Sequence, residues 1–415
     1  MEKDNLIVAI DIGTSKITTI VGDIGEYNDL HIIGLGEVPS RGIEKGIVTK
    51  PQDAISAIRA SINQAEDTAG FKIDHAVVNI GGPHLECQNE KEFSTFSIPQ
   101  KEIEKEDIDA LTQKVASKIG KENYEIIHIL PKRFILDDEN EVIDPVNLIG
   151  SKLEAEFHIV LDKINAYQNL KRVIEAANIK PIEFIANSIA SSAAVLYPEE
   201  KDMGVIVLDI GGGTTDIAVY KEGSLEYTKS LPLGGKQVTM DIAHRFKISK
   251  EDAENIKKEH GIAVVEGLAS NDIIEIYPRG SEESIQIEKY DLVDTIEARL
   301  SEIFEIVKSD LSKANLPKNL NAGIVITGGV ANTLFIRELA ESIFNIDVRI
   351  GKPKDFSGLS EKLFYPQYAT SIGMLTFMKN NNLFSQNSNA FSVKKDSFNI
   401  SETFKKLIDK IKEIF

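Results

Sequence analysis

Two glycine-rich turns, about 200 residues apart, carry residues that could bind phosphate. The first follows an apolar run and reads Asp11-Ile-Gly-Thr-Ser-Lys, and the second follows another and reads Asp209-Ile-Gly-Gly-Gly-Thr-Thr-Asp. Because glycine has no Cβ, backbone N–H groups in such turns approach an anion closely, and hydroxyls add donors. Two such turns facing each other could hold a polyphosphate from both sides. The predicted phosphate-binding residues in the turns are Gly13, Thr14, Ser15, Lys16, Gly211, Gly212, Gly213, Thr214 and Thr215.

Asp11 and Asp209 each end an apolar strand at the mouth of a turn. A carboxylate does not contact phosphate favourably, so its role there would be to hold Mg2+, through waters because that ion keeps much of its hydration shell. A third turn, Thr327-Gly-Gly-Val-Ala, again follows an apolar strand, and its bare backbone at Gly328 and Gly329 would suit a nucleoside. Any one such turn is an ordinary hairpin feature, but three at matching strand ends favour a nucleotide site.

The turns must be positioned by strands, and the flanking residues predict two related lobes. In each copy an apolar, β-branched run precedes the turn, a second follows it, and a third strand signal comes next, at residues 30–35 and 225–228. Helical spacing of apolar residues alternates with these strands, over residues 51–65, 165–177 and 292–307. Strand and helix both recur, so the predicted fold class is α/β.

Residues 84–162 have helix and strand signals of their own, a helix over 102–118 and a strand over 124–130. This pattern predicts an inserted subdomain between the two lobes. His31 and His158 lie in apolar, strand-like runs, which predicts that both are buried core residues with satisfied hydrogen bonds.

Length and composition bound the possibilities. The 415 residues are enough for two to four domains, and 47 basic against 65 acidic residues give a net charge of −18, which opposes nonspecific binding to nucleic acid. Cys87 is the only cysteine, so we expect a reducing cytoplasm and neither an internal disulfide nor a thiolate metal cage. We find no leader peptide pattern and no apolar run of 18 to 20 residues, so we expect that the chain is not exported and does not span a membrane.

The sequence does not match the motifs of other nucleotide-binding folds or of a zinc site. The sequence contains no GxxxxGK[ST], so a P-loop is absent. The nearest approach to GxGxxG, at residues 211–216, fails at its sixth position and opens a second strand instead of a helix, which disfavours a dinucleotide fold. The seven histidines lack the HExxH spacing of a zinc site.

The three turns resemble the phosphate-1, phosphate-2 and adenosine motifs of the superfamily that contains actin, the heat-shock chaperone ATPases and the sugar kinases. The resemblance covers nearly the whole chain and implies an actin-like, two-lobed ATPase fold with duplicated, hairpin-containing lobes that binds ATP and Mg2+. It also implies that residues 186–195 and 368–373, rich in small side chains, form the two connecting helices between the lobes.

Within that superfamily the chain is most similar to the bacterial cell-division family FtsA. The run Gly234-Gly-Lys-Gln-Val-Thr-Met-Asp-Ile-Ala and the run at residues 253–261 resemble that family's second-lobe signature. The resemblance implies that Gly234 and Gly235 contact phosphate and that Glu254 and Lys257 contact the nucleoside; an ordinary exposed helix is the alternative. It further implies an FtsZ-binding surface near residues 236–307, self-assembly, and contacts with other division proteins.

The resemblance also suggests a domain organisation. The expected parts are a first-lobe core at 1–83 and 163–195 with 364–378, an inserted FtsA-type subdomain at 84–162, a second-lobe core at 196–235 and 308–363, a second-lobe subdomain at 236–307, a linker at 379–399 and an amphipathic helix at 400–415.

Efficient hydrolysis of ATP is not expected. Members of the superfamily that hydrolyse ATP well carry Glu or Gln on the first connecting helix, and here Asn187 is the only side chain that could position a water. Three rival functions are an FtsA-like pilus-assembly protein of the PilM type, a small-molecule kinase, which would need a carboxylate base that no motif assigns, and a bacterial actin of the MreB kind.

The C-terminal segment predicts a membrane anchor. After an Asn- and Ser-rich linker, the apolar residues of 400–415 fall on one helical face with lysines at its borders and acids opposite. The predicted membrane-binding residues are Ile400, Phe404, Leu407, Ile408, Ile411, Ile414 and Phe415, with Lys405, Lys406, Lys410 and Lys412.

One such helix would be a weak, reversible anchor on anionic lipid, which polymerisation would strengthen through avidity. The alternative is that the helix docks on its own core or on a partner. Together with the resemblance, this predicts a cell-division protein that lies peripherally on the inner face of the cytoplasmic membrane, at the division site, where it contributes to septum formation.

Overall fold

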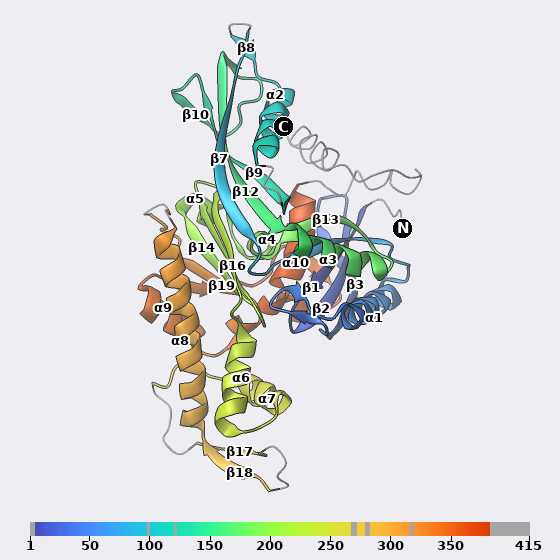
Figure 1. The fold of residues 1–415 in the computed structure, drawn as a ribbon, viewed down its shortest axis with the longest axis vertical. Helices are drawn as coiled ribbons and strands as arrows, with labels where there is room; N and C mark the ends of the chain where they lie inside the picture. The colour runs from blue at the N-terminus through green and yellow to red at the C-terminus, as the bar shows by residue number, and fades with distance from the viewer. Residues whose placement is uncertain are drawn as a thin grey trace.

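The computed structural model describes residues 5–97, 100–119, 123–266, 272–278, 283–314, 316 and 319–381. They form two neighbouring lobes, with a further subdomain extending from each (Figure 1). The predicted α/β class with two hairpin-containing lobes and an insertion is confirmed. The predicted helix at 400–415 and most of the predicted linker lie outside the described residues.

The first lobe is built on a six-stranded sheet of order β13-β6-β1-β2-β3-β21. β1 and β2 form an antiparallel hairpin around the first glycine turn, and β6 and β13 add parallel strands on the other side. Pro51 begins α1, where its missing N–H costs nothing. The elements are β1 (Leu6–Ile12), β2 (Lys16–Ile24), β3 (Leu30–Pro39), β4 (Ile43–Glu44), β5 (Ile47–Val48), α1 (Pro51–Ala69), β6 (His75–Ile80), α3 (Ile164–Ala176), β13 (Lys180–Ala186), β21 (Phe356–Gly358), η3 (Glu361–Phe364) and η4 (Pro366–Tyr368).

The second lobe repeats this plan in a five-stranded sheet of order β16-β15-β14-β19-β20. β14 and β15 form the hairpin around the second turn, and β19 lies parallel to β14 as β6 does to β1. β14 and β15 are almost fully buried, which explains why both read as continuous apolar runs. The elements are α5 (Pro198–Met203), β14 (Val205–Ile210), β15 (Thr215–Lys221), β16 (Ser224–Leu231), β19 (Ile324–Thr327), η2 (Gly329–Asn332), α9 (Ile336–Phe344) and β20 (Val348–Ile350).

The insertion leaves the first lobe after β6 and returns before α3 (Figure 1). Its four-stranded sheet, of order β10-β9-β12-β7, packs against α2 around a hydrophobic core of its own. The expected strand at 124–130 continues to Leu136 because β12 pairs with it along that whole length. The elements are β7 (Glu86–Thr95), β8 (Lys101–Glu102), α2 (Lys105–Lys118), β9 (Tyr124–Leu136), β10 (Asn140–Val142), β11 (Ile149–Gly150) and β12 (Lys152–Lys163).

A second extension projects from the opposite end of the second lobe (Figure 1). The long helix α8 buries an apolar stripe against the lobe and against α6, and a two-stranded hairpin lies at the tip. The elements are α6 (Gly235–Phe246), α7 (Lys250–His260), β17 (Ile273–Ile276), β18 (Ile285–Glu288) and α8 (Lys289–Lys313).

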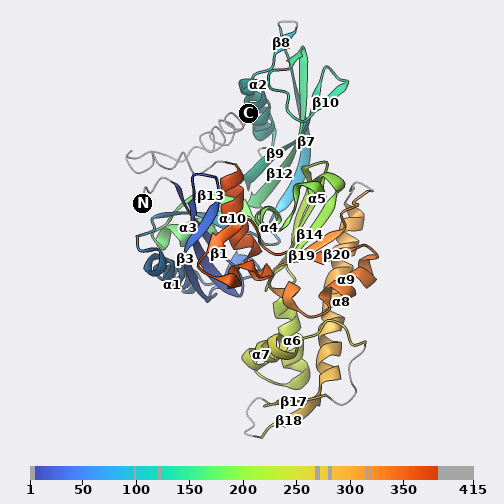
Figure 2. The same ribbon diagram turned by 180° about the vertical axis from the view of Figure 1, so that it is seen from behind.

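Two helices, α4 (Asn187–Val195) and α10 (Ala369–Asn380), pack on each other at the centre of the molecule (Figures 1 and 2). Their contact is so close that a Cβ on Gly373 would lie 1.8 Å from the Ala190 carbonyl oxygen. The small residues of the two predicted connecting segments therefore serve this contact. Among the helices of the described residues, none is both long enough and apolar enough to cross a bilayer.

Candidate functional site

The two glycine turns face each other across the lobes. A Cβ built on Gly212 would lie 2.0 Å from the Ser15 hydroxyl oxygen, and one on Gly213 would lie 2.6 Å from that of Thr14. Each turn is closed by a backbone hydrogen bond between equivalent positions. In the first turn the Gly13 N–H donates to the Lys16 carbonyl at 3.0 Å, and in the second the Gly211 N–H donates to the Thr214 carbonyl at 2.9 Å. Glycine is needed here because the two turns pack directly on each other, with the Ser15 and Thr14 hydroxyls against Gly212 and Gly213.

The start of α6 is fastened to the second turn. The N–H groups of Gly235 and Lys236 donate to the carbonyls of Gly211 and Gly212 at 2.9 and 2.7 Å. A Cβ on Gly234 would lie 2.5 Å from the Gly211 carbonyl oxygen, so only glycine permits this contact. Lys236 also reaches across to the first lobe, where its Nζ donates to the Thr14 carbonyl at 2.8 Å.

The two predicted Mg2+ carboxylates lie below the turns, and each is held by a hydroxyl from α10. Ser371 donates to Asp11 Oδ2 at 2.7 Å, and Thr370 donates to Asp209 Oδ2 at 2.8 Å. Gly328, at φ +84°, comes so close to Asp209 that a Cβ there would lie 2.4 Å from Oδ1. One connecting helix therefore contacts the carboxylates of both lobes.

Two amide side chains link Asp11 of the first lobe to Asp216 of the second. Asn79, near the end of β6, donates to Asp11 Oδ1 at 3.1 Å and to Asn187 Oδ1 at 2.9 Å. Asn187, the first residue of α4, donates in turn to Asp216 Oδ2 at 3.1 Å. Thr214, in the second turn, donates to the same Asp216 oxygen at 3.0 Å. A hydrogen-bonded chain thus connects the two lobes beneath the turns.

The carboxyl groups of Asp11, Asp209 and Asp216 are buried close to one another, which disfavours their charged forms. Burial raises the pKa of Asp209 to about 7, and the charges of Asp216 and Asp11 add to that shift against the bond from Thr370. Burial also raises the pKa of Asp11 and of Asp216, in spite of the hydrogen bonds that each accepts. A divalent cation beside them would relieve both desolvation and repulsion. In the described residues no three His, Cys, Asp or Glu side chains converge to ligate a metal directly.

The side chain of Lys16, predicted to contact phosphate, instead contacts Glu37 and Tyr368. Its Nζ lies 2.8 Å from Glu37 Oε2 and 3.3 Å from the centre of the Tyr368 ring. Burial lowers the pKa of Lys16 and the bond to Glu37 opposes that change. The ammonium group remains at the base of the first turn, where it partly offsets the charge of Asp11.

Glu254 and Lys257, predicted to contact the nucleoside, bind each other beside α6. Lys257 Nζ lies 2.6 Å from Glu254 Oε2 and donates to Thr239 Oγ1 at 2.8 Å and to the Gly235 carbonyl at 3.1 Å. Burial lowers the pKa of Lys257; in Glu254 burial acts upward, but the Lys257 charge and the bonds it accepts leave its pKa lowered overall. The pair therefore fixes α7 against the start of α6, next to the third turn, where Val330 approaches Gly235.

At Gly329, the other predicted nucleoside residue, a Cβ would make only an ordinary contact, with Gln367 Cβ at 3.9 Å. The structure therefore brings the residues predicted from the three turns and from the 234–261 run to one place between the lobes. The predicted membrane-binding residues at 400–415 lie outside the described residues.

Sequence reasoning missed the polar residues that hold the carboxylates: Asn79, Thr370, Ser371 and Ser230, whose hydroxyl bonds Asp216. Asn79 carries a detectable signal, since it is a lone amide in an apolar strand that leads into a Gly-Gly pair. The hydroxyls of α10 carry none, because small residues there are equally explained by helix packing.

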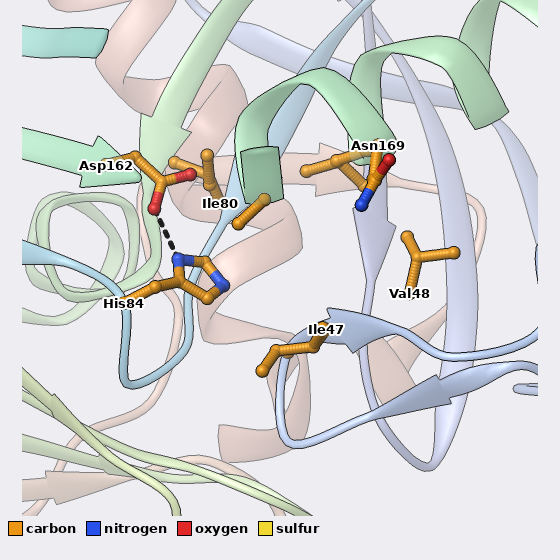
Figure 3. A pocket seen from close by; sticks show the side chains of 9 residues that line it. Ile47, Val48, Ile80, His84, Asp162 and Asn169 are labelled. Carbon is orange, nitrogen blue, oxygen red and sulfur yellow. Dashed lines mark hydrogen bonds and ion pairs between the residues drawn. The ribbon is translucent and has the colours of Figure 1, made fainter. Parts of the chain in front are cut away.

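A small pocket lies at the base of the insertion (Figure 3). His84 and Asp162, where the chain enters and leaves that subdomain, face each other there and are joined through Nδ1 and Oδ1. The pocket has room for about one water molecule. Asp162 Oδ2 is buried and finds no hydrogen-bond partner among the residues that the structure describes, so a water in the pocket would satisfy it. The Gly82 N–H donates to Ser230 at 3.0 Å, which links this base to the carboxylates.

Comparison with known families agrees with the geometry. The model described as "Cell division protein FtsA" matches residues 206–373, and the one described as "SHS2 domain inserted in FTSA" matches residues 82–161.

Comparison with solved structures shows the fold alone. A PilM-PilN type IV pilus biogenesis complex is similar with a TM-score of 0.62 and 16% identity, covering 90% of this chain and 98% of that one. MreB5 of Spiroplasma citri bound to ADP is similar with a TM-score of 0.56 and 15% identity, covering 93% and 99%. The fold is therefore the actin-like ATPase fold.

Curated relatives extend the similarity to almost the whole chain. Cell division protein FtsA of Neisseria meningitidis serogroup B is 36% identical over 375 residues, 90% of each chain. The FtsA proteins of Escherichia coli K12 and Bacillus subtilis 168 are 32% and 33% identical, over 91% and 92% of this chain and 91% and 85% of their own. With that identity over that length, and with the insertion in place, this chain belongs to the FtsA family of cell division proteins.

Proposed function

We propose that this chain is an ATP-binding cell-division scaffold that assembles with copies of itself and tethers FtsZ polymers to the inner face of the cytoplasmic membrane. Its membership of the FtsA family supports the division role. The observation that carries the nucleotide part is the opposition of the two glycine turns, with hydroxyls facing the space that a Cβ would fill. Phosphate groups between lobes would favour the closed arrangement and so bias assembly.

The residues present fit ATP with Mg2+. The backbone and hydroxyls of Thr14, Ser15, Gly212 and Gly213 would border the phosphates. Gly234 and Gly235 would lie beside them, with their own N–H groups already donating to Gln237 Oε1 and to the Gly211 carbonyl. The third turn with Glu254 and Lys257 would border the nucleoside. Asp11 and Asp209 would hold Mg2+ through waters, and the ion would screen the phosphate charge. Structures of the same fold include MreB5 bound to ADP and to AMPPNP, which supports the assignment.

Hydrolysis is expected to be slow. Asn187, the one side chain placed to orient a water on the first connecting helix, already uses its oxygen for Asn79 and its nitrogen for Asp216. An amide engaged at both ends is poorly placed to hold an attacking water as well. ATP would therefore serve as a bound ligand between the lobes.

The second-lobe extension suits the role of an FtsZ-binding surface. Its two-stranded hairpin has unpaired edges within the described residues and leaves Ile273, Tyr277 and Ile285 largely exposed. Exposed apolar side chains beside open strand edges are typical of surfaces that accept an extended peptide. We assign the C-terminal peptide of FtsZ to this surface on the basis of the family.

Flotation on vesicles tests the anchor. The full chain, with ATP and Mg2+, should float with vesicles that contain phosphatidylglycerol and bring FtsZ with it, whereas a chain that ends at Ser397 should stay in solution. Ile408→Glu, on the apolar face, should abolish flotation, and Asp409→Ala, at the next position but on the opposite face, should not. Flotation of the shortened chain would contradict the anchor, and flotation without FtsZ would contradict the tether.

A pilus-assembly role of the PilM type is a second candidate, favoured by the TM-score of 0.62 to the PilM-PilN complex. The low identity of 16% to that complex, against more than 30% to FtsA proteins, disfavours it. If the full chain stays in solution and does not bind FtsZ, this candidate becomes the better explanation of the fold.

A further inference from the structure

Asn79 is a buried amide that the glycine turns do not explain. It lies in β6 between Val78 and Ile80, in a strand that is otherwise apolar, and only 4% of it is exposed. A buried amide costs free energy unless its oxygen and both its N–H groups find partners. Here the Asn79 side chain makes three hydrogen bonds, and all three go to residues around the candidate site.

One backbone group fixes the orientation of this amide. The Ile12 N–H, which can only donate, lies 2.7 Å from Asn79 Oδ1. The nitrogen of Asn79 must then face the other way, toward the oxygens of Asp11 and Asn187. Because Asn187 thereby presents its oxygen to Asn79, its own nitrogen faces Asp216. The hydrogen bond from the Ile12 N–H therefore fixes the donor and acceptor in each of the other bonds, from Asn79 to Asp11, from Asn79 to Asn187 and from Asn187 to Asp216.

The absence of a side chain at Gly81 makes room for this arrangement. A Cβ on Gly81, two residues after Asn79, would lie 2.2 Å from Asn187 Nδ2, so glycine is required there. Both Asp11 oxygens are occupied by donors, Asn79 on one side and Ser371 on the other. Donors on both oxygens fix the orientation of the carboxylate and the direction of its remaining lone pairs.

We infer that Asn79 is a positioning residue for the bound cation: it orients Asp11 toward a hydrated Mg2+ and, through Asn187, links that carboxylate to Asp216 of the second lobe. This role rests on the proposed binding of ATP with Mg2+. Groups that orient a metal-binding carboxylate without touching the metal are usually worth a factor of 10 to 100 in metal affinity. A purely structural amide would stabilise β6 equally well without bonding to a carboxylate at the site.

The test measures how strongly Mg2+ enhances nucleotide binding by the full chain. A fluorescent ATP analogue is titrated with Mg2+ and with EDTA, and the ratio of the two affinities is compared among wild type, Asn79→Ala and Asn89→Ala. Asn89 is the control because its amide also bonds between parts of the molecule, to the Glu226 carbonyl at 3.1 Å, but away from the site. We expect the Mg2+ enhancement to fall about tenfold or more in Asn79→Ala and to be unchanged in Asn89→Ala.

Asn187→Ala breaks the same link at a half-buried position and serves if Asn79→Ala does not fold. In the variant that carries both substitutions, we expect the loss of Mg2+ enhancement, expressed as a free energy, to be smaller than the sum of the losses in the two single variants, because Asn79 and Asn187 belong to one series of hydrogen bonds. An unchanged enhancement in a folded Asn79→Ala or Asn187→Ala variant would overturn the inference alone. Failure of the wild-type chain to bind the analogue would overturn the proposed function, and the inference with it.

Discussion

His128 accepts a hydrogen bond that only a neutral imidazole can accept. Its Nε2 lies 3.1 Å from the N–H of Ala186, the residue before α4, and its ring packs edge-on against Phe377 of α10. Burial lowers the pKa of His128 to about 4, from an ordinary value of about 6.5. One histidine therefore couples the insertion strand β9 to both connecting helices, on condition that it stays uncharged.

This condition predicts an acid-sensitive fold. Between pH 6.5 and 4 the unfolded chain binds a proton at His128 that the folded chain does not, so the free energy of unfolding falls as the pH falls, by about 3 kcal/mol at most. When the midpoint of thermal unfolding is plotted against pH across this range, the slope should be shallower for His128→Gln than for wild type. His244→Gln, at an exposed position on α6, should keep the wild-type slope, and an equal slope in both variants would refute the assignment.

At the scale of elements, the close contact between α4 and α10 depends on Gly373. A Cβ there would lie 1.8 Å from the Ala190 oxygen and 2.4 Å from its carbonyl carbon, both backbone atoms that move only with the helix. Alanine is the better helix former by about 1 kcal/mol, so helix propensity alone predicts that Gly373→Ala stabilises the protein. Overpacking of this kind typically costs 1 to 3 kcal/mol, which reverses the sign.

Gly373→Ala should therefore lower the midpoint of thermal unfolding and weaken ATP binding, since a shift of α4 moves Asn187 away from Asn79 and Asp216. Asn380→Ala, at the exposed end of the same helix, should change neither quantity. A stabilised Gly373→Ala variant would show that the helices separate without cost.

The elements that the sequence predicted well are those whose signal is local. Each hairpin turn has its glycines and flanking strands within one short stretch, residues 6–24 in the first lobe and 205–221 in the second, and β1 with β2 and β14 with β15 pair as the pattern indicates. The prediction for His158 is confirmed, since it is fully buried and bonds Asn89 and Thr228. The prediction for His31 is wrong: β3 buries alternate residues, and His31 lies on its exposed face beside Asp29 and Ser357.

The parts of the site that could not be predicted depend on contacts distant in sequence. Ser371 meets Asp11 across 360 residues, and Thr370 meets Asp209 across 161. No local pattern distinguishes a hydroxyl that packs between helices from one that holds a carboxylate. The second predicted connecting segment, residues 368–373, covers only the first part of α10, which continues to Asn380 because its buried face continues.

At the scale of the whole molecule, the insertion contacts both lobes although it belongs in sequence to the first. Strands β7, β9 and β12 contact β16, the edge strand of the second lobe. His158 meets Thr228 at 3.1 Å, and Ser224 donates to the Lys132 carbonyl at 2.6 Å. We call these contacts between the insertion and β16 the seam. β16 also carries Ser230, which bonds Asp216, so the seam and the site share one strand.

Lys132 is the charged centre of the seam. Its side chain is only 4% exposed and lies 2.9 Å from Glu156 of the insertion and 2.7 Å from Glu226 of the second lobe. Removing one partner of a buried ion pair typically costs 3 to 5 kcal/mol, because the charges left behind lose their compensation. Arg133 still pairs with Glu156, so the uncompensated charge in a Lys132→Met variant would be chiefly Glu226, which keeps some access to water.

We therefore expect Lys132→Met to lower the free energy of unfolding by less than that, about 2 kcal/mol, and to speed amide hydrogen exchange in β7 and β16 before other strands. Lys132→Met combined with Glu226→Gln should recover part of the stability but not the slow exchange, because it removes the stranded charge without restoring the bridge. Lys152→Met, which breaks the exposed pair with Asp138 at the far end of the insertion, is the matched control and should leave the seam protected. If exchange in β16 stays slow in Lys132→Met, the ion pairs of Lys132 do not hold the insertion against the second lobe.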